Sequence, residues 1–389
     1  MTPPLTLFLF CRVIDNYGDM AVTWRLIKGL YQVQPSLNIT LVTDDLRALS
    51  QLVPSFEEPL KVIDWTWFET HIPEEMDLPQ VTIEAFACDL PSSFLQALHS
   101  APLSPGHPLR CRLIINLEYL TAESWFLGVH TLPSLTGTTF VEKFTWVPGF
   151  LSGLGGLIFD RVYLQQVELA RSDLPAAKEN FWRALKSLLP DLGPCPIHRG
   201  WISVFSYEHD FSNLAQTLSG MEPCPLVLLP PGLMTPGLRS SFAKWGLQNH
   251  IQTLPFLPQT LYDQMITVCD LNLVRGEESL VRAALCGRPF LWHAYLQDEG
   301  YQIEKVQALL QVIEPFWTNA DAKSAFEEAH IAYNTRIQNS SQELPREDFR
   351  FFSRFSAQVT QTLQEFAEFL KNNGDCPQRL LDFIQTFRV

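Results

Sequence analysis

A short turn in this sequence places two carboxylates around a glycine, directly after the apolar run 5–14. The residues of the turn are Asp15, Asn16, Tyr17, Gly18 and Asp19. If the apolar run is a buried strand, the turn lies at the carboxyl end of a sheet, where α/β proteins bind ligands. One acid could then orient the loop while the other acts as a base, and Gly18 would let the backbone approach a ligand. The alternative is ordinary turn and helix-cap chemistry.

A second stretch brings a cation and two acids to the expected start of a helix. Its residues are Arg275, Gly276, Glu277, Glu278 and Ser279. The amides at a helix start, together with an arginine, form an anion site that suits a diphosphate. Two adjacent glutamates would repel a diphosphate, so at least one should face sugar or ribose hydroxyls or a cationic acceptor. An acidic first turn with Ser279 near the cap is the alternative.

Aromatic and amide side chains follow two other apolar runs. They are Phe205, Tyr207, Phe256, Gln259 and Tyr262. Aromatic faces can stack on a nucleobase while an amide reads its edge, although such rings also often belong to the core. His293, at another strand end, could contact a ligand, although a hydrogen-bonded structural histidine is favoured. No spacing typical of metal ligands is present, which favours a metal-independent reaction.

The elements that must position these residues alternate between apolar runs and helical periodicity. After the first turn, Met20, Trp24, Ile27 and Tyr31 recur at helical spacing. Further strands are expected at LNITLVTDD, KVIDW, VTIEAFA and CRLIINLEYL, and then at WISVFSY, LVLLPPG, IQTLPFL, LNLVRG and PFLWHAY. This alternation predicts two doubly wound α/β domains that face each other across an interdomain cleft.

The domain boundaries are predicted from composition and periodicity. Residues 1–172 should form the N-terminal domain and residues 173–357 the C-terminal domain, with a helical segment 358–389 packing back on the first. The glycine-rich segment 153–156 matches neither dinucleotide nor Walker spacing and is interpreted as a flexible interdomain loop.

Composition narrows the class of protein. The formal charge of −14 disfavours a duplex nucleic-acid binder. The eight cysteines are scattered and form no CxxC motif, as expected of reduced core cysteines. No apolar run reaches the roughly 18 residues of a membrane span, and LTLFLF makes a poor signal peptide. A cytoplasmic protein without membrane or nucleic-acid partners is expected.

Several long blocks resemble one family in order and over most of the chain. They are CRVIDNYGDMAVTWRL, INLEYLTAESW, PGFLSGLGGL, FSYE, PFLPQ, LVRGEESLVRAALCGRPFLWH and YLQDE. The family is that of the bacterial protein-arginine rhamnosyltransferases that modify translation elongation factor P (the EarP family). The resemblance implies a GT-B fold, dTDP-β-L-rhamnose as donor substrate, no further cofactor, inversion without metal, and an arginine of elongation factor P as acceptor.

The resemblance also implies roles for individual residues. Asp19 corresponds to the general base, Asp15 to a second required acid and Glu277 to the second essential carboxylate. The residues implied around the nucleotide sugar are Asn16, Tyr17, Gly18, Tyr207, Gln259 and 275–279, with Phe205, Phe256 and Tyr262 around thymine. The chain departs from the family at Met20 and Ala21, where Ile-Gly is usual, and at Glu278, where Asp is usual.

Two other functions remain open from the sequence. One is a GT-B glycosyltransferase with a lipid or glycan acceptor, although no basic or amphipathic membrane-facing stripe is found. The other is a non-catalytic module that binds the elongation factor, which the retained acids of both motifs disfavour. A Rossmann dehydrogenase is disfavoured because GxGxxG is absent.

Overall fold

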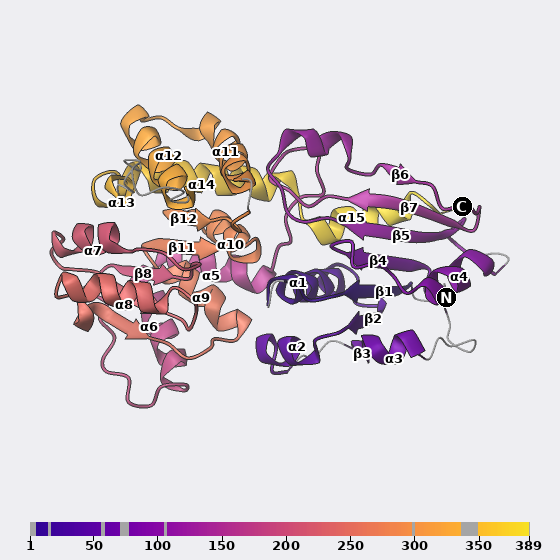
Figure 1. The fold of residues 1–389 in the computed structure, drawn as a ribbon, viewed down its shortest axis with the longest axis horizontal. Coiled ribbons are helices and arrows are strands. Elements are labelled where there is room, and N and C mark those ends of the chain that lie inside the picture. The colour runs from indigo at the N-terminus through magenta and orange to yellow at the C-terminus, as the bar shows by residue number, and fades with distance from the viewer. Residues whose placement is uncertain are drawn as a thin grey trace. The chain divides into compact units, whose positions relative to one another are not determined.

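The computed structural model describes residues 5–14, 17–55, 59–70, 78–104, 107–297, 300–335 and 349–388. The chain forms two compact units. The first unit combines Met1–Asp160 with Asn373–Val389, and the second unit is Arg161–Asn372. In Figure 1 the first unit runs from indigo to purple and ends with the yellow C-terminal helix.

The first unit contains a seven-stranded sheet in the order β3-β2-β1-β4-β5-β7-β6. All neighbours pair in parallel except β6 and β7. The five strands predicted in this part of the sequence are confirmed. The sixth parallel strand, β7, was not predicted, because most of its residues are only partly buried and several are polar. The strands are β1 (Thr6–Cys11), β2 (Asn38–Thr43), β3 (Lys61–Asp64), β4 (Val81–Ala85), β5 (Arg112–Leu117), β6 (Pro133–Ser134) and β7 (Val141–Trp146).

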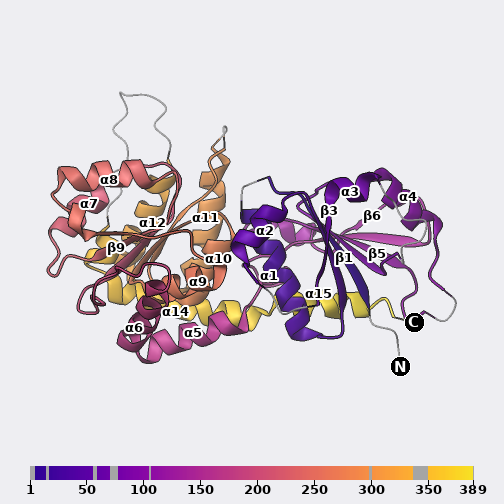
Figure 2. The same cartoon turned by 90° about the horizontal axis from the view of Figure 1, so that it is seen from below.

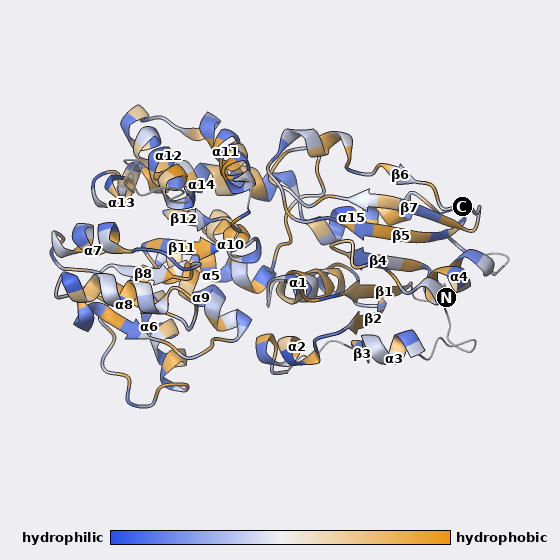
Figure 3. Ribbon diagram, viewed as in Figure 1, coloured by the Kyte–Doolittle hydropathy of each residue, from blue (hydrophilic) through white to orange (hydrophobic). Residues whose placement is uncertain are grey.

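Alternation along β1 divides the core of the first unit between the two faces of the sheet. Leu7, Leu9 and Cys11 pack in one apolar cluster with helices α1 (Gly18–Val33), α2 (Leu46–Leu52) and α15 (Cys376–Gln385). Phe8 and Phe10 point to the other face. There they pack with α3 (Trp65–Thr70) and α4 (Ser92–Ser100). Figure 2 shows α1 and α15 on one side of this sheet and α3 and α4 on the other. In Figure 3 β1 is coloured as hydrophobic, as expected of a strand that is covered on both faces.

The second unit has a five-stranded parallel sheet in the order β10-β9-β8-β11-β12. All five strands predicted there are confirmed: β8 (Trp201–Val204), β9 (Leu226–Leu229), β10 (Ile251–Thr253), β11 (Leu271–Arg275) and β12 (Phe290–His293). The helices are α5 (Arg161–Ser172), α6 (Leu174–Lys186), α7 (Ser212–Ser219), α8 (Thr235–Lys244), α9 (Gln259–Val268), α10 (Glu278–Cys286), α11 (Tyr301–Ile313), α12 (Ala320–Asn334), α13 (Arg350–Ser353) and α14 (Ser356–Asn373). No helix in the described ranges is both long and apolar enough to cross a membrane.

Both sheets reverse their strand order beside the first strand of the unit. In the first unit the chain moves from β1 to β2 and β3 and then returns to place β4 on the other side of β1. In the second unit β8 and β11 stand in the same relation. Ligands of open α/β sheets bind outside the carboxyl ends of the strands at such switch points. The two motifs rich in acids follow β1 and β11.

The predicted domain boundaries need correction. Helix α5 packs against α6 and α9, so the second unit begins at Arg161 rather than at 173. Helix α14 also belongs to the second unit, because the Phe366 ring contacts Phe316 (5.7 Å between centroids) and Glu368 pairs with Arg171 (2.8 Å). Only Asn373–Val389, which carries α15, returns to the first unit, rather than 358–389.

The glycine-rich segment 153–156 is not an interdomain loop. It lies within the first unit, and the neighbouring Leu154 and Leu157 are buried. A Cβ on Gly155 would lie 2.6 Å from the Trp146 ring nitrogen and 2.9 Å from the Val147 carbonyl oxygen. The glycine is therefore required for close packing against β7.

Candidate functional site

The carboxyl end of β1 and the start of α1 bring Asp19 into the first unit's candidate site. Asp19 stands in the first turn of α1 and is only 3% exposed. Its Oδ2 accepts a hydrogen bond of 2.8 Å from the Ile14 amide. The buried carboxylate therefore holds the two ends of the turn together, which is the loop-orienting role expected of one of the two acids.

Of the other residues of this turn, the structure describes Tyr17 and Gly18. Asp15 and Asn16 lie outside the described residues. Gly18 is the first residue of α1. The hydroxyl of Tyr17 donates to the Gln51 side chain in α2, and its ring packs against the core of the first unit. The loop is held further by the Val13 amide, which donates to Asp44 Oδ1 (3.0 Å) at the end of β2.

In the second unit, Arg275 is the centre of a cluster built from three elements. It is the last residue of β11, and its guanidinium lies over the rings of Phe205 (4.5 Å) and Tyr207 (4.8 Å), which follow β8. Tyr262 of α9 meets Phe205 edge-on at 5.6 Å. Burial raises the pKa of Tyr262, so its hydroxyl stays protonated. The structure thus brings together a cation and three rings that the sequence had placed in two separate motifs.

The turn between β11 and α10 has the geometry of an anion site at a helix start. Gly276 has φ +64°, a left-handed conformation that favours glycine. Its carbonyl accepts a hydrogen bond from Trp292 Nε1 (2.8 Å), and the Arg275 carbonyl accepts one from the Ser279 hydroxyl. These bonds fix the turn so that the first amides of α10 point away from the helix.

The two glutamates of this turn have different surroundings. Glu277 is the N-cap residue of α10, but its side chain makes no capping hydrogen bond, which disfavours a purely structural cap. Glu278 pairs with Arg282 one turn later (3.2 Å), and Arg282 is 1% exposed. The Arg282 guanidinium also lies 5.0 Å over the Tyr163 ring. Pairing with Arg282 offsets the negative charge of Glu278 and lessens the repulsion of a diphosphate.

Phe256 and Gln259 lie on the loop and helix that follow β10. Phe256 is 40% exposed, whereas Gln259 is buried as the first residue of α9. Gln259 and Tyr262 are three residues apart on this helix and so share one of its faces.

Sequence reasoning missed a buried network behind Tyr207. His293 Nδ1 lies 2.7 Å from the Ser206 hydroxyl, which in turn lies 2.7 Å from the Tyr333 hydroxyl. Burial, with the nearby His209 and Arg275, lowers the pKa of His293 to about 3, so the ring is neutral at neutral pH. The prediction of a structural, hydrogen-bonded His293 is confirmed.

Of the residues that sequence reasoning missed, one could have been predicted from its spacing and another could not. Arg282 could have been paired with Glu278 from their spacing on one helix. Tyr333 gave no signal, because α12 reaches β12 only through tertiary packing.

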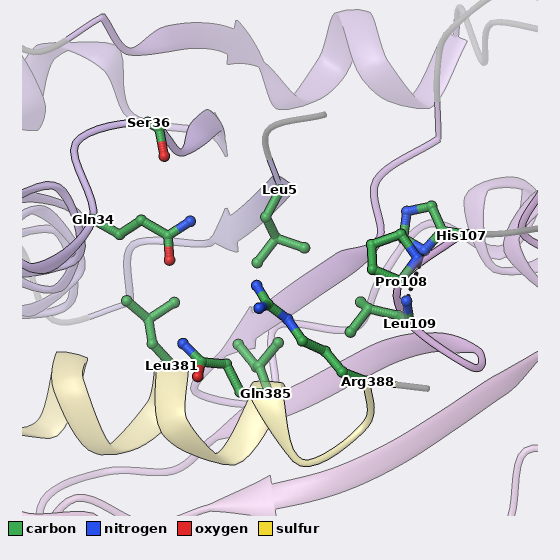
Figure 4. Close-up of a pocket in the computed structure, with 10 residues that line it drawn as sticks. Leu5, Gln34, Ser36, His107, Pro108, Leu109, Leu381, Gln385 and Arg388 are labelled. Carbon is green, nitrogen blue, oxygen red and sulfur yellow. Dashed lines mark hydrogen bonds between the residues drawn. The ribbon is translucent and has the colours of Figure 1, made fainter. Parts of the chain in front are cut away.

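A cavity of about 540 Å³ lies elsewhere in the first unit. It is lined by Leu5 before β1, by Gln34 after α1, and by Arg388 near the C-terminus (Figure 4). The cavity therefore lies at the amino ends of the strands, the opposite edge from Asp19. In the described part of the chain no group of three or more His, Cys, Asp or Glu residues could hold a metal ion.

Comparisons with a family model and with known proteins point to the same family. The sequence model of the family described as elongation-factor P (EF-P) rhamnosyltransferase EarP matches residues 7–385. A protein-arginine rhamnosyltransferase of Pseudomonas putida is 34% identical over 320 residues, which cover 78% of this chain and 80% of that protein. One of Neisseria meningitidis is 32% identical over 336 residues, which cover 82% and 81%.

One solved structure is similar over almost the whole chain. It is described as the structural basis for EarP-mediated arginine glycosylation of translation elongation factor EF-P. The TM-score is 0.60 at 23% identity, covering 98% of this chain and 99% of the other. At this identity the likeness concerns the fold, and it agrees with the GT-B type of α/β fold expected from the sequence.

Proposed function

This chain belongs to the EarP family of elongation factor P rhamnosyltransferases, and we propose that it moves rhamnose from dTDP-β-L-rhamnose to an arginine side chain of translation elongation factor P. The observation that carries the proposal is the cluster around Arg275, a cation held over two aromatic rings at the start of α10. Because the proposed acceptor is a translation factor, we place the reaction in the cytoplasm.

The second unit is proposed to bind the donor. The Arg275 guanidinium and the first amides of α10 would hold the diphosphate, since both favour negative charge. Phe205, Phe256 and Tyr262 would contact the thymine ring, with Gln259 reading its edge. Tyr207, Glu278 and Ser279 are proposed to contact the sugar and phosphate groups of the donor, or to hold in place the turn that contacts them.

The first unit is proposed to supply the base. An arginine side chain has a pKa above about 12, so a carboxylate cannot deprotonate it in advance. Asp19 would instead accept a hydrogen bond from the guanidinium and orient one nitrogen towards the anomeric carbon. Asp19 Oδ2 also accepts the Ile14 amide, which fixes the orientation of the carboxylate. Asp15, Asn16, Tyr17 and Gly18 would shape the loop around it.

The proposed reaction is a single displacement with inversion. The guanidinium nitrogen forms a bond to the anomeric carbon while the bond from that carbon to the diphosphate oxygen breaks. The electron pair leaves with dTDP, and the nitrogen loses its proton to Asp19 late, when bond formation has made it acidic. Glu277 is the second carboxylate, with the task of holding the guanidinium or the sugar. Arg275 and the helix amides stabilise the leaving group in place of a metal ion.

The direct test is to incubate the protein with dTDP-rhamnose and purified elongation factor P, with EDTA present, and to measure the intact mass of the factor. We expect a gain of one rhamnosyl group that maps to an arginine. Release of dTDP without any gain in mass would point to another acceptor. A strict requirement for added magnesium or manganese would contradict the metal-free mechanism, and binding of the factor without turnover would indicate a non-catalytic module.

A further inference from the structure

The loop after β4 combines unusual backbone conformations with an aromatic stack. Phe86, Ala87 and Asp89 have φ of 57°, 50° and 53°, left-handed values that non-glycine residues seldom adopt. Phe86 is buried, and its ring stacks on Tyr119 with centroids 4.5 Å apart and planes at 17°. Tyr119 follows β5 and is 38% exposed. Such strained conformations persist where surrounding contacts fix them, and they concentrate at functional sites.

Contacts with the neighbouring strands fix this loop at the carboxyl edge of the sheet. The Phe86 amide donates to the Leu117 carbonyl at the end of β5 (2.7 Å), and the Cys88 thiol donates to the Phe10 carbonyl in β1 (3.5 Å). The loop therefore joins the ends of β1, β4 and β5. It lies beside the switch point from which α1 starts.

The stack lies on the same face of the sheet as the start of α1. Phe86 belongs to the apolar cluster that contains Met20 and Ala21, the residues directly after Asp19. The end of β5 is two strands away from the end of β1, which corresponds to roughly 10 Å. An extended chain covers that distance in about three residues.

We propose that the Phe86–Tyr119 stack is a docking platform for the acceptor segment that flanks the reacting arginine, with Tyr119 as a specificity-determining contact. This inference rests on the proposed function. The strained loop holds Phe86, Phe86 holds the Tyr119 ring in one orientation, and the exposed part of that ring receives a planar cationic or peptide group of the acceptor. Glu118, whose carboxylate accepts from Asn116 (2.7 Å), adds negative charge next to Tyr119 and favours a basic segment.

The test compares Tyr119→Leu, Tyr119→Phe and a matched control, Phe140→Leu. Phe140 is 39% exposed but precedes β7, at the opposite edge of the same sheet. For Tyr119→Leu we expect the KM for elongation factor P to rise about threefold to tenfold, the usual range for one stacking contact. The kcat and the affinity for dTDP should stay within about twofold. Tyr119→Phe should restore the KM, and Phe140→Leu should not change it.

A double-mutant cycle locates the contact. Acceptor positions up to about four residues from the modified arginine are replaced one at a time by alanine and assayed with wild-type enzyme and Tyr119→Leu. For at least one acceptor position, the alanine substitution should raise the KM of the wild-type enzyme but not that of Tyr119→Leu.

If the wild-type enzyme modifies the factor, the proposed function stands, and several outcomes would then overturn the docking platform alone. They are an unchanged KM in Tyr119→Leu, an equal rise in Phe140→Leu, a fall in kcat at constant KM, and a cycle without coupling at any position. Failure of the wild-type enzyme to modify the factor would overturn the platform and the proposed function together.

Discussion

Asp19 shows how one residue can serve the fold and the proposed chemistry at once. Its burial and its bond to the Ile14 amide hold the two ends of the turn together, a structural role that acids often have in turns. The sequence offered two acids for two roles, one to orient the loop and one to act as a base. The distinction could not be predicted, because spacing alone does not show which carboxylate the loop amides face.

A substitution at Arg275 tests whether dTDP binding depends on the stacked guanidinium or only on its positive charge. Arg275→Lys keeps the positive charge but loses the flat guanidinium over Phe205 and Tyr207. We therefore expect the affinity for dTDP to fall by about fivefold to tenfold in calorimetry. Arg239→Lys is the control, since Arg239 is exposed on α8 of the same unit. Equal affinities in wild type and Arg275→Lys would contradict the stacked arrangement.

At the scale of elements, the edge of the second sheet is closed by side chains of α12. The Asn334 side chain bonds the Trp292 carbonyl (2.7 Å) and the Ala294 amide (2.8 Å), and His330 Nε2 receives the Trp292 amide (3.4 Å). These contacts satisfy backbone groups that an edge strand would otherwise expose. They also bury His293 at the end of β12 in a neutral form.

This arrangement predicts how stability depends on pH. The pKa of His293 falls from 6.5 to about 3 on folding, so as the pH decreases the unfolded chain takes up the proton first. Stability that is present above pH 6.5 is therefore lost progressively towards pH 3. At pH 5 the loss from this residue is about 2 kcal/mol, since each pH unit corresponds to about 1.4 kcal/mol.

The variant His293→Gln isolates that contribution. Gln can still bond Ser206 but does not titrate, so its free energy of unfolding should depend less on pH between 6.5 and 5 than that of the wild type. Denaturant unfolding at pH 7 and pH 5 measures both proteins. The buried His330, whose pKa is lowered to about 4, acts equally in both. Parallel pH dependences would contradict a neutral, buried His293.

The elements also show where sequence patterns are sufficient. Continuous apolar runs predicted β1, β2, β8 and β11 correctly, because strands that are covered on both faces consist mainly of apolar residues. β7 was missed because its middle residues are polar and only partly buried. The Ser206 to Tyr333 network and the Phe86 stack depend on contacts between distant segments, which no local pattern encodes.

At the scale of the whole molecule, the chain builds two doubly wound units and returns to the first one at its end. The sequence predicted the return but placed it at 358, because the amphipathic pattern of α14 does not reveal which unit it covers. Ring contacts with Phe316 and the pairing of Glu368 with Arg171 assign α14 to the second unit. Of the last two helices, α15 is the one that packs with α1.

This division assigns separate tasks to the two units. The donor is proposed to bind residues of the second unit, whereas the proposed base, Asp19, lies on the first. A change in Asp19 should therefore affect chemistry much more than donor binding, and the control is an acid that does cap a helix. Asp173 caps α6 by accepting the Ala176 amide (3.0 Å), so Asp173→Asn should leave turnover unchanged.

The most direct measurement is the single-turnover rate of Asp19→Asn with dTDP-rhamnose and elongation factor P, together with its affinity for dTDP. We predict a rate at least roughly a hundredfold below that of the wild type, as expected for loss of a general base, with dTDP affinity within about twofold and the fold intact. A wild-type rate in Asp19→Asn would remove this carboxylate from catalysis and leave the turn after β1 with a structural role alone.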